Sequence, residues 1–360
     1  MDNDVHKSPY GDNKINLLNL HYTQMCKFFV SIGEKKFCAD QIMHWIYHKY
    51  CDDFNKMTNI STVLRKKLHD ICVIKAPNFV KEKKSIDGTI KWQVAVNNHL
   101  VETVYIPEKT RSTLCVSSQI GCVLECTFCA TGKMVFKGNL KVSDIIGQIW
   151  NAAKIINNDP FKKKRPITNI VFMGMGEPLL NLKNVVNSLK IILNYCGFNI
   201  SKNKVTLSTA GIVPALDQLS SMIDVNLAIS LHAPNNLIRN KIMSINKKYN
   251  IQDLLYSVSR YLNISKANRG GVTIEYVMLD RINDEVFHAE ELAFILKKIP
   301  SKINLIPWNI FTHSIYKSSD FVRIKKFASI LIKKGFFTII RKNRGIDIKA
   351  ACGQLIGEII

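Results

Sequence analysis

The sequence predicts an α/β protein in which a small helical accessory domain precedes a partial (β/α)6 TIM-like barrel. From residue 113 onward, six apolar strand-like runs are each followed by a stretch with apolar residues at helical spacing. Such alternation predicts a parallel sheet covered by helices. Six units are fewer than the eight of a complete barrel, so an open barrel is favoured over a doubly wound sheet.

The N-terminal region has a different pattern. Apolar residues recur at helical spacing over residues 13–30, 38–51 and 60–72. A turn at Asp87-Gly88 follows, with strand-like runs at 89–96 and 100–106. We therefore expect a helical accessory domain over residues 1–90 and a core over residues 91–360.

In the core, strands and helices are expected to alternate to the end of the chain. The predicted strands cover residues 113–118, 168–173, 204–209, 225–231, 272–279 and 302–306. The predicted helices cover residues 143–157, 182–195, 213–222, 251–263, 285–298 and 320–334. Ser143 and Asp144 are typical of a helix start, and Gly335 is typical of a helix end. Active sites of such barrels lie at the carboxyl ends of the strands.

Composition narrows the function classes. The chain has 360 residues, and 50 basic against 28 acidic residues give a net charge of +22. This surplus attracts nucleic acid, although compositional drift in an AT-rich lineage would produce it too. No apolar run approaches the roughly 18 residues of a membrane span, and no signal-peptide pattern is visible. Ten cysteines are too sparse for a disulfide scaffold. We expect a cytoplasmic protein without membrane association.

Cys122, Cys126 and Cys129 form the most informative pattern, spaced Cys-x3-Cys-x2-Cys on the loop after the first core strand. Three thiolates this close can hold three irons of a four-iron cluster and leave the fourth iron open to a small molecule. Structural zinc needs a fourth ligand, and no partner Cys-x2-Cys pair exists. Chance clustering of buried cysteines is the remaining alternative.

With Phe128 before its last cysteine, this loop resembles the signature of the radical SAM superfamily. The resemblance implies a [4Fe-4S] cluster held by Cys122, Cys126 and Cys129. The open iron would bind S-adenosylmethionine (SAM), whose cleavage yields a 5′-deoxyadenosyl radical.

Polar residues at the ends of the other predicted strands favour cofactor binding. Residues 173–178 are similar to the glycine-rich SAM motif of the superfamily, which implies that Gly176 and Glu177 hold the methionine amino group. The remaining expected cofactor contacts are Ser208, Ser230, Leu231, His232 and Asn309. Each alone is typical of a satisfied strand-end residue, but their shared rim favours a common site.

Further stretches narrow the resemblance to the bacterial dual-specificity methyltransferases that act on adenine C2. They are residues 101–107, 113–119, 172–179, 229–234 and 350–355, and the similarity runs from about residue 38 to 355. It implies methylation of one adenine in 23S rRNA and of an adenine next to the anticodon in tRNA. It also implies two SAM per turnover, a flavodoxin or ferredoxin system as electron donor, and a monomeric enzyme.

The resemblance also assigns three catalytic residues. Cys352 would receive the methyl group, carry it as S-methylcysteine and form a covalent adduct with RNA. Cys115 would then attack the Cys352 sulfur, release the product and leave a disulfide. Glu102 would be the proton acceptor. Without the resemblance, Cys352 would be a small residue of the tail, Cys115 a buried strand cysteine and Glu102 a solvent-facing strand residue.

Basic runs are candidates for RNA contact: Lys81, Lys83 and Lys84, then residues 162–165, then Arg341, Lys342 and Arg344. Two alternative functions are open. A relative that methylates adenine C8 shares the cysteine scheme, but the stretches around Glu102 and Cys352 favour C2. An RNA-binding iron–sulfur protein without catalysis would need neither Cys352 nor Cys115.

Overall fold

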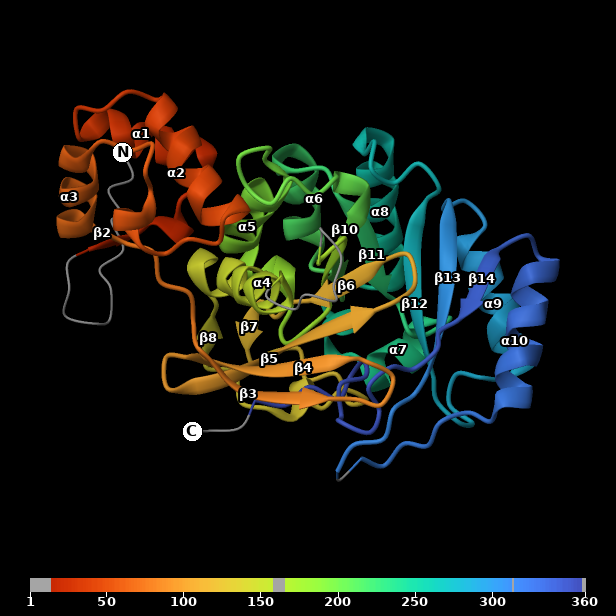
Figure 1. Cartoon of the computed structure of the whole chain (residues 1–360). Coiled ribbons are helices and arrows are strands. Elements are labelled where there is room, and N and C mark those ends of the chain that lie inside the picture. The colour runs from red at the N-terminus through yellow and green to blue at the C-terminus, as the bar shows by residue number, and fades with distance from the viewer. Residues whose placement is uncertain (1–13, 158–165, 313, 358–360) are drawn as a thin grey trace. The chain divides into compact units, whose positions relative to one another are not determined.

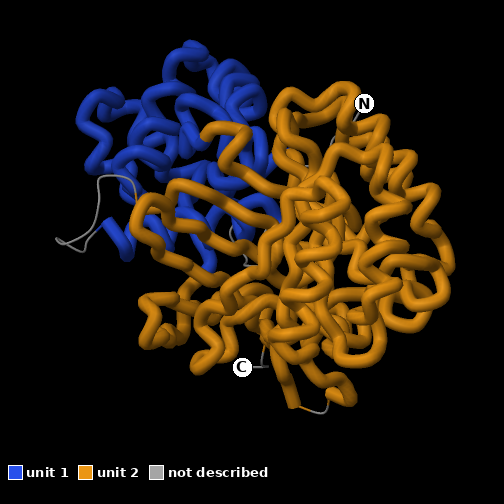
Figure 2. The backbone as a smooth tube through the Cα atoms, turned by 90° about the vertical axis from the view of Figure 1, so that its right-hand side faces the viewer, with its two compact units in different colours: residues 1–77, 141–164, 187–200 blue, residues 78–140, 165–186, 201–360 orange. Residues whose placement is uncertain are grey.

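The computed structural model describes residues 14–157, 166–312 and 314–357. Its contacts divide the chain into two compact units (Figure 2). The first contains residues 1–77, 141–164 and 187–200, and the second contains residues 78–140, 165–186 and 201–360. Within the described ranges, no helix is long and apolar enough to cross a membrane.

The first unit is mainly helical. It contains α1 (Tyr22–Ser31), α2 (Phe37–His48), α3 (Thr62–Ile71), α4 (Val142–Asn157) and a parallel pair, β1 (Ile15–Asn16) and β2 (Cys72–Val73). The Ser61 hydroxyl caps α3 by accepting from the Leu64 amide. The Trp150 indole of α4 donates to the Ile46 carbonyl of α2 at 2.7 Å. The helices predicted at 38–51 and 60–72 are confirmed, whereas the first helix begins only at Tyr22.

A ten-stranded sheet forms the second unit, in the order β14-β13-β12-β11-β10-β9-β6-β5-β4-β3 (Figure 1). The antiparallel strands are β3 (Phe79–Lys84), β4 (Ile90–Val96) and β5 (His99–Pro107), and β5 also pairs antiparallel with β6. The parallel strands are β6 (Ser112–Cys115), β9 (Asn169–Phe172), β10 (Val205–Thr209), β11 (Asn226–Ser230), β12 (Val272–Met278), β13 (Ser301–Pro307) and β14 (Phe337–Ile340). Among the described residues β3 and β14 do not pair with each other, so the sheet is open.

Helices follow the parallel strands along the chain. They are α5 (Leu182–Leu193), α6 (Val213–Met222), α7 (Asn236–Ile242), α8 (Ile251–Ile264), α9 (Val286–Leu296) and α10 (Phe321–Lys333). In the second unit α6 packs on α8, and α9 packs on α10. With α4 of the first unit, all six predicted strand-then-helix pairs are confirmed, as is a small N-terminal helical region.

Several strands and one helix of the second unit were not predicted from the sequence patterns. Strands β3 and β14 are the two edges of the sheet, and all of their residues are exposed or half-buried; β3 is mostly charged, and β14 is only four residues long. Helix α7 has only seven residues, too few for helical spacing to be recognised. A small antiparallel pair, β7 (Gln119–Ile120) and β8 (Gly138–Asn139), precedes and follows the cysteine loop.

Candidate active site

The three cysteines of the Cys-x3-Cys-x2-Cys loop line one cavity. Its other walls come from the carboxyl ends of β9 to β13, including Phe172, Ser208, Ser230, Val277 and Ile306. The carboxyl ends of parallel strands meet at one edge of a sheet, so residues far apart in sequence converge here. The cavity therefore lies at the strand ends, where the sequence predicts the site.

Tight backbone packing gives the cysteine loop its shape. A Cβ at Gly132 would lie 2.7 Å from the Cys126 carbonyl oxygen, so only glycine fits there. The Thr127 amide donates to the Ile242 carbonyl at 3.1 Å, and the Ser244 hydroxyl donates to the Leu124 carbonyl at 2.8 Å. These bonds fix the loop to the segment that follows α7.

Burial and mutual repulsion keep the three thiols protonated unless a cation compensates them. Burial raises the pKa of Cys122 to about 12 and also raises the pKa of Cys126 and Cys129; repulsion from neighbouring cysteines adds to this. Bound iron would supply the positive charge that stabilises the thiolates. In the described ranges no three His, Cys, Asp or Glu side chains are grouped as ligands of one metal ion. Each cysteine of a three-thiolate cubane binds a different iron, so the donor set fits a cluster.

Gly176 and Glu177 lie in the cavity wall and also support the fold. Gly176 has φ +92°, and a Cβ there would lie 2.4 Å from the Gln119 side chain. The Glu177 carboxylate accepts hydrogen bonds from the Thr209 hydroxyl at 2.7 Å and from the amides of Ala210 and Leu179 at 2.8 and 3.0 Å. It thereby links the end of β9 to the end of β10. Burial raises the pKa of Glu177, and these donors oppose that effect.

The other expected cofactor residues divide into two groups. Ser208 and Ser230 line the cavity, with their hydroxyl oxygens 3.5 Å apart. His232 also lines the cavity, and its backbone has φ +58°. Its Nδ1 accepts a hydrogen bond from the Val277 amide. Burial lowers the pKa of His232 to about 3, so the ring is neutral. Leu231 is fully buried and is not among the cavity-lining residues.

The tail that carries Cys352 lies against the cysteine loop. The Ala130 amide donates to the Gly353 carbonyl at 2.7 Å, and the Thr131 hydroxyl donates to the Leu355 carbonyl at 2.7 Å. Asn309, another cavity residue, donates to the Cys352 carbonyl at 3.2 Å. Cys352 therefore faces the same cavity as the three cluster cysteines, although it is more than 220 residues from them in sequence.

Cys115 is the last residue of β6 and is a buried free thiol. Cys352 is also a free thiol, but it is half-buried. Burial raises the pKa of Cys115 to about 12, and repulsion from Cys352 adds to it, while the Arg341 charge lowers it. No disulfide joins cysteines of the described residues. The predicted Cys115–Cys352 disulfide thus stays a prediction for one step of a reaction cycle.

Glu102, in β5, is buried but does not line the cavity. Its Oε1 pairs with the Lys91 ammonium at 2.9 Å, and its Oε2 accepts from the Ile356 amide at 2.9 Å. Burial raises the pKa of Glu102, whereas the Lys91 charge opposes that shift. The role implied by the resemblance, proton acceptor, stays a prediction.

Two charged cavity residues were not predicted as part of this site. Glu275 Oε1 accepts from the Asn304 amide at 3.0 Å, while its Oε2 has no hydrogen-bond partner and lies 3.8 Å from Arg341 Nη1. Arg341 was expected to contact RNA, yet it lines the cavity beside Cys352, whose charge raises the pKa of Arg341. The sequence did hold a signal for Glu275, since a glutamate within the predicted apolar strand 272–279 indicates a buried charge.

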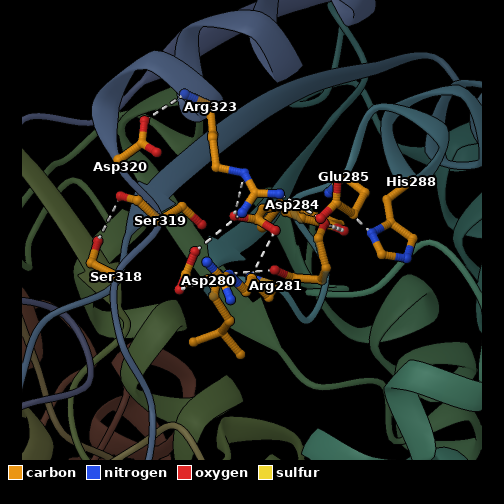
Figure 3. A network of polar contacts seen from close by, with 12 residues as sticks. Asp280, Arg281, Asp284, Glu285, His288, Ser318, Ser319, Asp320 and Arg323 are labelled. Carbon is orange, nitrogen blue, oxygen red and sulfur yellow. Dashed lines mark hydrogen bonds and ion pairs between the residues drawn. The ribbon is translucent and has the colours of Figure 1, made fainter.

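A polar network connects α10 to the loop after β12. Figure 3 shows the Arg323 side chain of α10 directed at the loop after β12, where its guanidinium pairs with Asp280, the fully buried Asp284 and Glu285. In the same loop the Asn283 amide donates to the carbonyls of His232 and Val277, at 2.8 and 2.7 Å. Arg323 therefore stabilises the loop that holds the His232 backbone.

The open barrel with a three-cysteine loop at its strand ends defines the radical SAM class of enzymes. Residues 116–292 match the Radical SAM superfamily, and residues 15–74 match the Ribosomal RNA large subunit methyltransferase N-terminal domain. The chain belongs to the family of dual-specificity RNA methyltransferases RlmN, as its similarity to two relatives shows.

Both relatives are from Buchnera aphidicola and are named Dual-specificity RNA methyltransferase RlmN. The one from subspecies Acyrthosiphon pisum (strain APS) is 62% identical over 347 residues, covering 96% of this chain and 95% of the relative. The one from subspecies Schizaphis graminum (strain Sg) is 60% identical over 350 residues, covering 97% of this chain and 96% of the relative.

A solved structure confirms the fold. The crystal structure of a radical SAM methyltransferase from Sphaerobacter thermophilus superposes with a TM-score of 0.87 at 35% identity. The match covers 95% of this chain and 99% of that chain.

Proposed function

We propose that this protein methylates C2 of a specific adenine in 23S rRNA and of the adenine next to the anticodon in tRNA. The proposal rests mainly on the position of Cys352, which lines the cavity of the three cysteines. The segment that carries it is hydrogen-bonded to residues 130 and 131. A sulfur placed there can receive a methyl group and later present it to a base. Membership of the RlmN family supports the RNA substrates.

Cys122, Cys126 and Cys129 would hold a [4Fe-4S] cluster, and Gly176, Glu177, Ser208, Ser230, His232 and Asn309 would surround SAM. Leu231, also predicted to contact the cofactor, would act through its backbone: its amide donates to the Glu275 carbonyl and its carbonyl accepts from the Arg239 guanidinium, which holds Ser230 and His232 in place. When bound, cluster and SAM together supply a methyl group and, after one-electron reduction, an adenosyl radical. The apolar cavity wall, with Phe172, Val277 and Ile306, excludes water from such a radical.

The protein residues carry the methyl group in three stages. Cys352 Sγ loses its proton, receives a methyl group and, after that group loses a hydrogen atom, is bonded through carbon to adenine C2. The adduct formed by the carbon radical has one unpaired electron, so it must lose one electron, which the oxidised cluster would accept, together with the C2 proton. A base takes this proton, the role predicted for Glu102. The Cys115 thiolate then attacks Cys352 Sγ. The sulfur–carbon bond breaks with its electron pair on carbon, which takes a proton and becomes the C2 methyl group. A thiol reductant must reduce the resulting disulfide before the next turnover.

RNA binding would use residues 1–90 and basic surface groups. The match of residues 15–74 to an rRNA methyltransferase N-terminal domain supports the first assignment. Lys81, Lys83 and Lys84 lie on β3, where five of the six residues are exposed. Residues 162–165 lie outside the described residues. We further propose a monomer that works in the cytoplasm and takes its electrons from a flavodoxin or ferredoxin system.

The test is product analysis. RNA incubated with reconstituted protein, SAM and a one-electron reductant is digested and analysed by mass spectrometry and chromatography against standards. The proposal predicts 2-methyladenosine. Detection of 8-methyladenosine would assign the protein to the C8 reaction, and unmodified RNA with intact SAM cleavage would contradict a methyltransferase function.

A further inference from the structure

Lys91 of β4 and Glu102 of β5 form an ion pair, and the proton-acceptor role predicted for Glu102 does not account for its partner Lys91. The Lys91 ammonium lies 2.9 Å from Glu102 Oε1, and the two side chains are only 5% and 1% exposed. A buried ion pair usually stabilises a fold no better than apolar residues of the same volume, because both charges lose their hydration. Stability alone therefore does not account for this pair.

The remaining polar atoms of the pair bind the tail at two points. Lys91 Nζ donates to the Lys349 carbonyl at 2.9 Å, and Glu102 Oε2 accepts from the Ile356 amide at 2.9 Å. Cys352 lies between these two anchors. One pair of charges on adjacent strands thus holds both ends of the segment 349–356.

The middle of this segment has no charged anchor. Its bonds to Ala130, Thr131, Asn309 and Ile310 are neutral hydrogen bonds, and each is weaker than a hydrogen bond to a charged group. Gly353, next to Cys352, has φ +79°, and a Cβ there would make an ordinary contact with the Phe128 carbonyl oxygen at 3.6 Å. Exchanging one neutral bond of the middle therefore costs less than breaking a charged anchor at either end.

The pair is also connected to both places that the Cys352 sulfur must reach. The Ser117 hydroxyl donates to the Glu102 carbonyl at 2.6 Å and accepts from the Met175 amide at 2.9 Å, in the glycine-rich wall of the cavity. The adjacent Thr103 hydroxyl donates to the Cys115 carbonyl at 2.7 Å. Hydrogen bonds of Ser117 and Thr103 thus connect the strand that carries Glu102 to the cavity wall and to Cys115.

We propose that Lys91 and Glu102 are positioning residues that fix Lys349 and Ile356, so that Cys352 moves only between the cofactor cavity and Cys115. This inference rests on the proposed function, in which Cys352 is the methyl carrier. It differs from the predicted proton-acceptor role of Glu102, because a proton acceptor acts only after RNA is attached. A positioning pair acts earlier, when Cys352 receives its methyl group.

The test uses reconstituted protein without RNA and measures the transfer of labelled methyl from SAM to Cys352. Lys91→Met and Glu102→Gln are expected to slow transfer by about tenfold or more, since small displacements of reacting groups cost this much. Iron content and SAM cleavage should stay at the wild-type level. Lys326→Met is the control, because it removes an exposed lysine of α10 that has no assigned role in RNA binding or in holding the tail, and should change nothing.

Hydrogen–deuterium exchange of residues 350–356 gives a readout that does not depend on activity. Exchange should rise in Lys91→Met and stay unchanged in Lys326→Met. The double variant Lys91→Met/Glu102→Gln leaves no stranded charge, so it should fold even if Lys91→Met does not, and its methyl transfer should still be slow because the Lys349 anchor is missing.

The outcomes separate the possibilities. Normal methylation of Cys352 and unchanged exchange in the Lys91 variants would overturn the positioning role. Normal methylation in Glu102→Gln, with a stall only when RNA is present, would overturn it for Glu102 and support a proton acceptor. If wild-type protein transfers no methyl group to Cys352, the proposed function fails, while the exchange data still decide whether the pair holds the tail.

Discussion

Release of RNA from the covalent adduct should depend steeply on pH. Burial is the main cause that raises the pKa of Cys115 to about 12 in the free protein, and only the thiolate attacks a sulfur. Repulsion from Cys352 is absent in the adduct, where that sulfur is bonded to carbon, but the burial remains. At pH 8 a thiol with that pKa is about 0.01% ionised, compared with about a quarter for an ordinary cysteine of pKa about 8.5. Because the pKa is raised, the thiolate fraction rises about tenfold per pH unit between about pH 7 and 10.

The rate of RNA release should also depend on Arg341. Its charge lowers the pKa of Cys115, so Arg341→Met should slow adduct decay at every pH without changing the slope. Arg344→Met is the control, since Arg344 pairs with Asp87 at 3.9 Å and does not line the cavity. The assay forms the adduct at one pH, jumps to another and follows loss of the protein–RNA band on denaturing gels. A decay rate independent of pH over this range would refute attack by a buried Cys115 thiolate.

Three further outcomes are expected. Replacing Cys122, Cys126 or Cys129 with Ala should remove most of the iron, about four per chain in reconstituted protein, and abolish SAM cleavage; retained iron and cleavage would contradict the cluster assignment. The logarithm of the RNA binding constant should fall linearly with the logarithm of salt concentration if phosphates are contacted, and a salt-independent constant would mean that the +22 charge is compositional. Arg323→Met leaves the buried Asp284 carboxylate unpaired and should lower the free energy of unfolding by about 3 kcal/mol, measured by denaturant titration, with part of the loss restored by adding Asp284→Asn.

The sequence predicted the elements whose burial shows in their residue pattern. The six core strands have apolar runs. Ser208, Ser230 and Asn309 could be predicted as site residues because they lie where those strands end. Edge strand β3 is mostly charged and exposed, and β14 has only four residues, so neither was recognised as a strand.

Contacts between distant segments left no signal at all. The pattern around Glu102 predicts a solvent-facing residue, but the tail covers it and Lys91 neutralises it. Arg341 follows a short edge strand in a basic run, which predicts surface exposure, yet the strand end directs it to the cavity. Such pairings depend on the folded arrangement of strands and tail, so only the structure reveals them.

The fate of the adduct in cysteine variants tests the central claim most directly. With Cys115→Ala, Cys352 should still be methylated and should still attack RNA, and the reaction should then stop as a crosslink that survives denaturation. Mass spectrometry should find one bridging carbon between Cys352 and adenine C2. Cys352→Ala and the double variant should give no crosslink, because the carrier is missing. A crosslink in Cys352→Ala but not in Cys115→Ala would reverse the two roles, and its absence from both would contradict methyl transfer through a covalent protein–RNA intermediate.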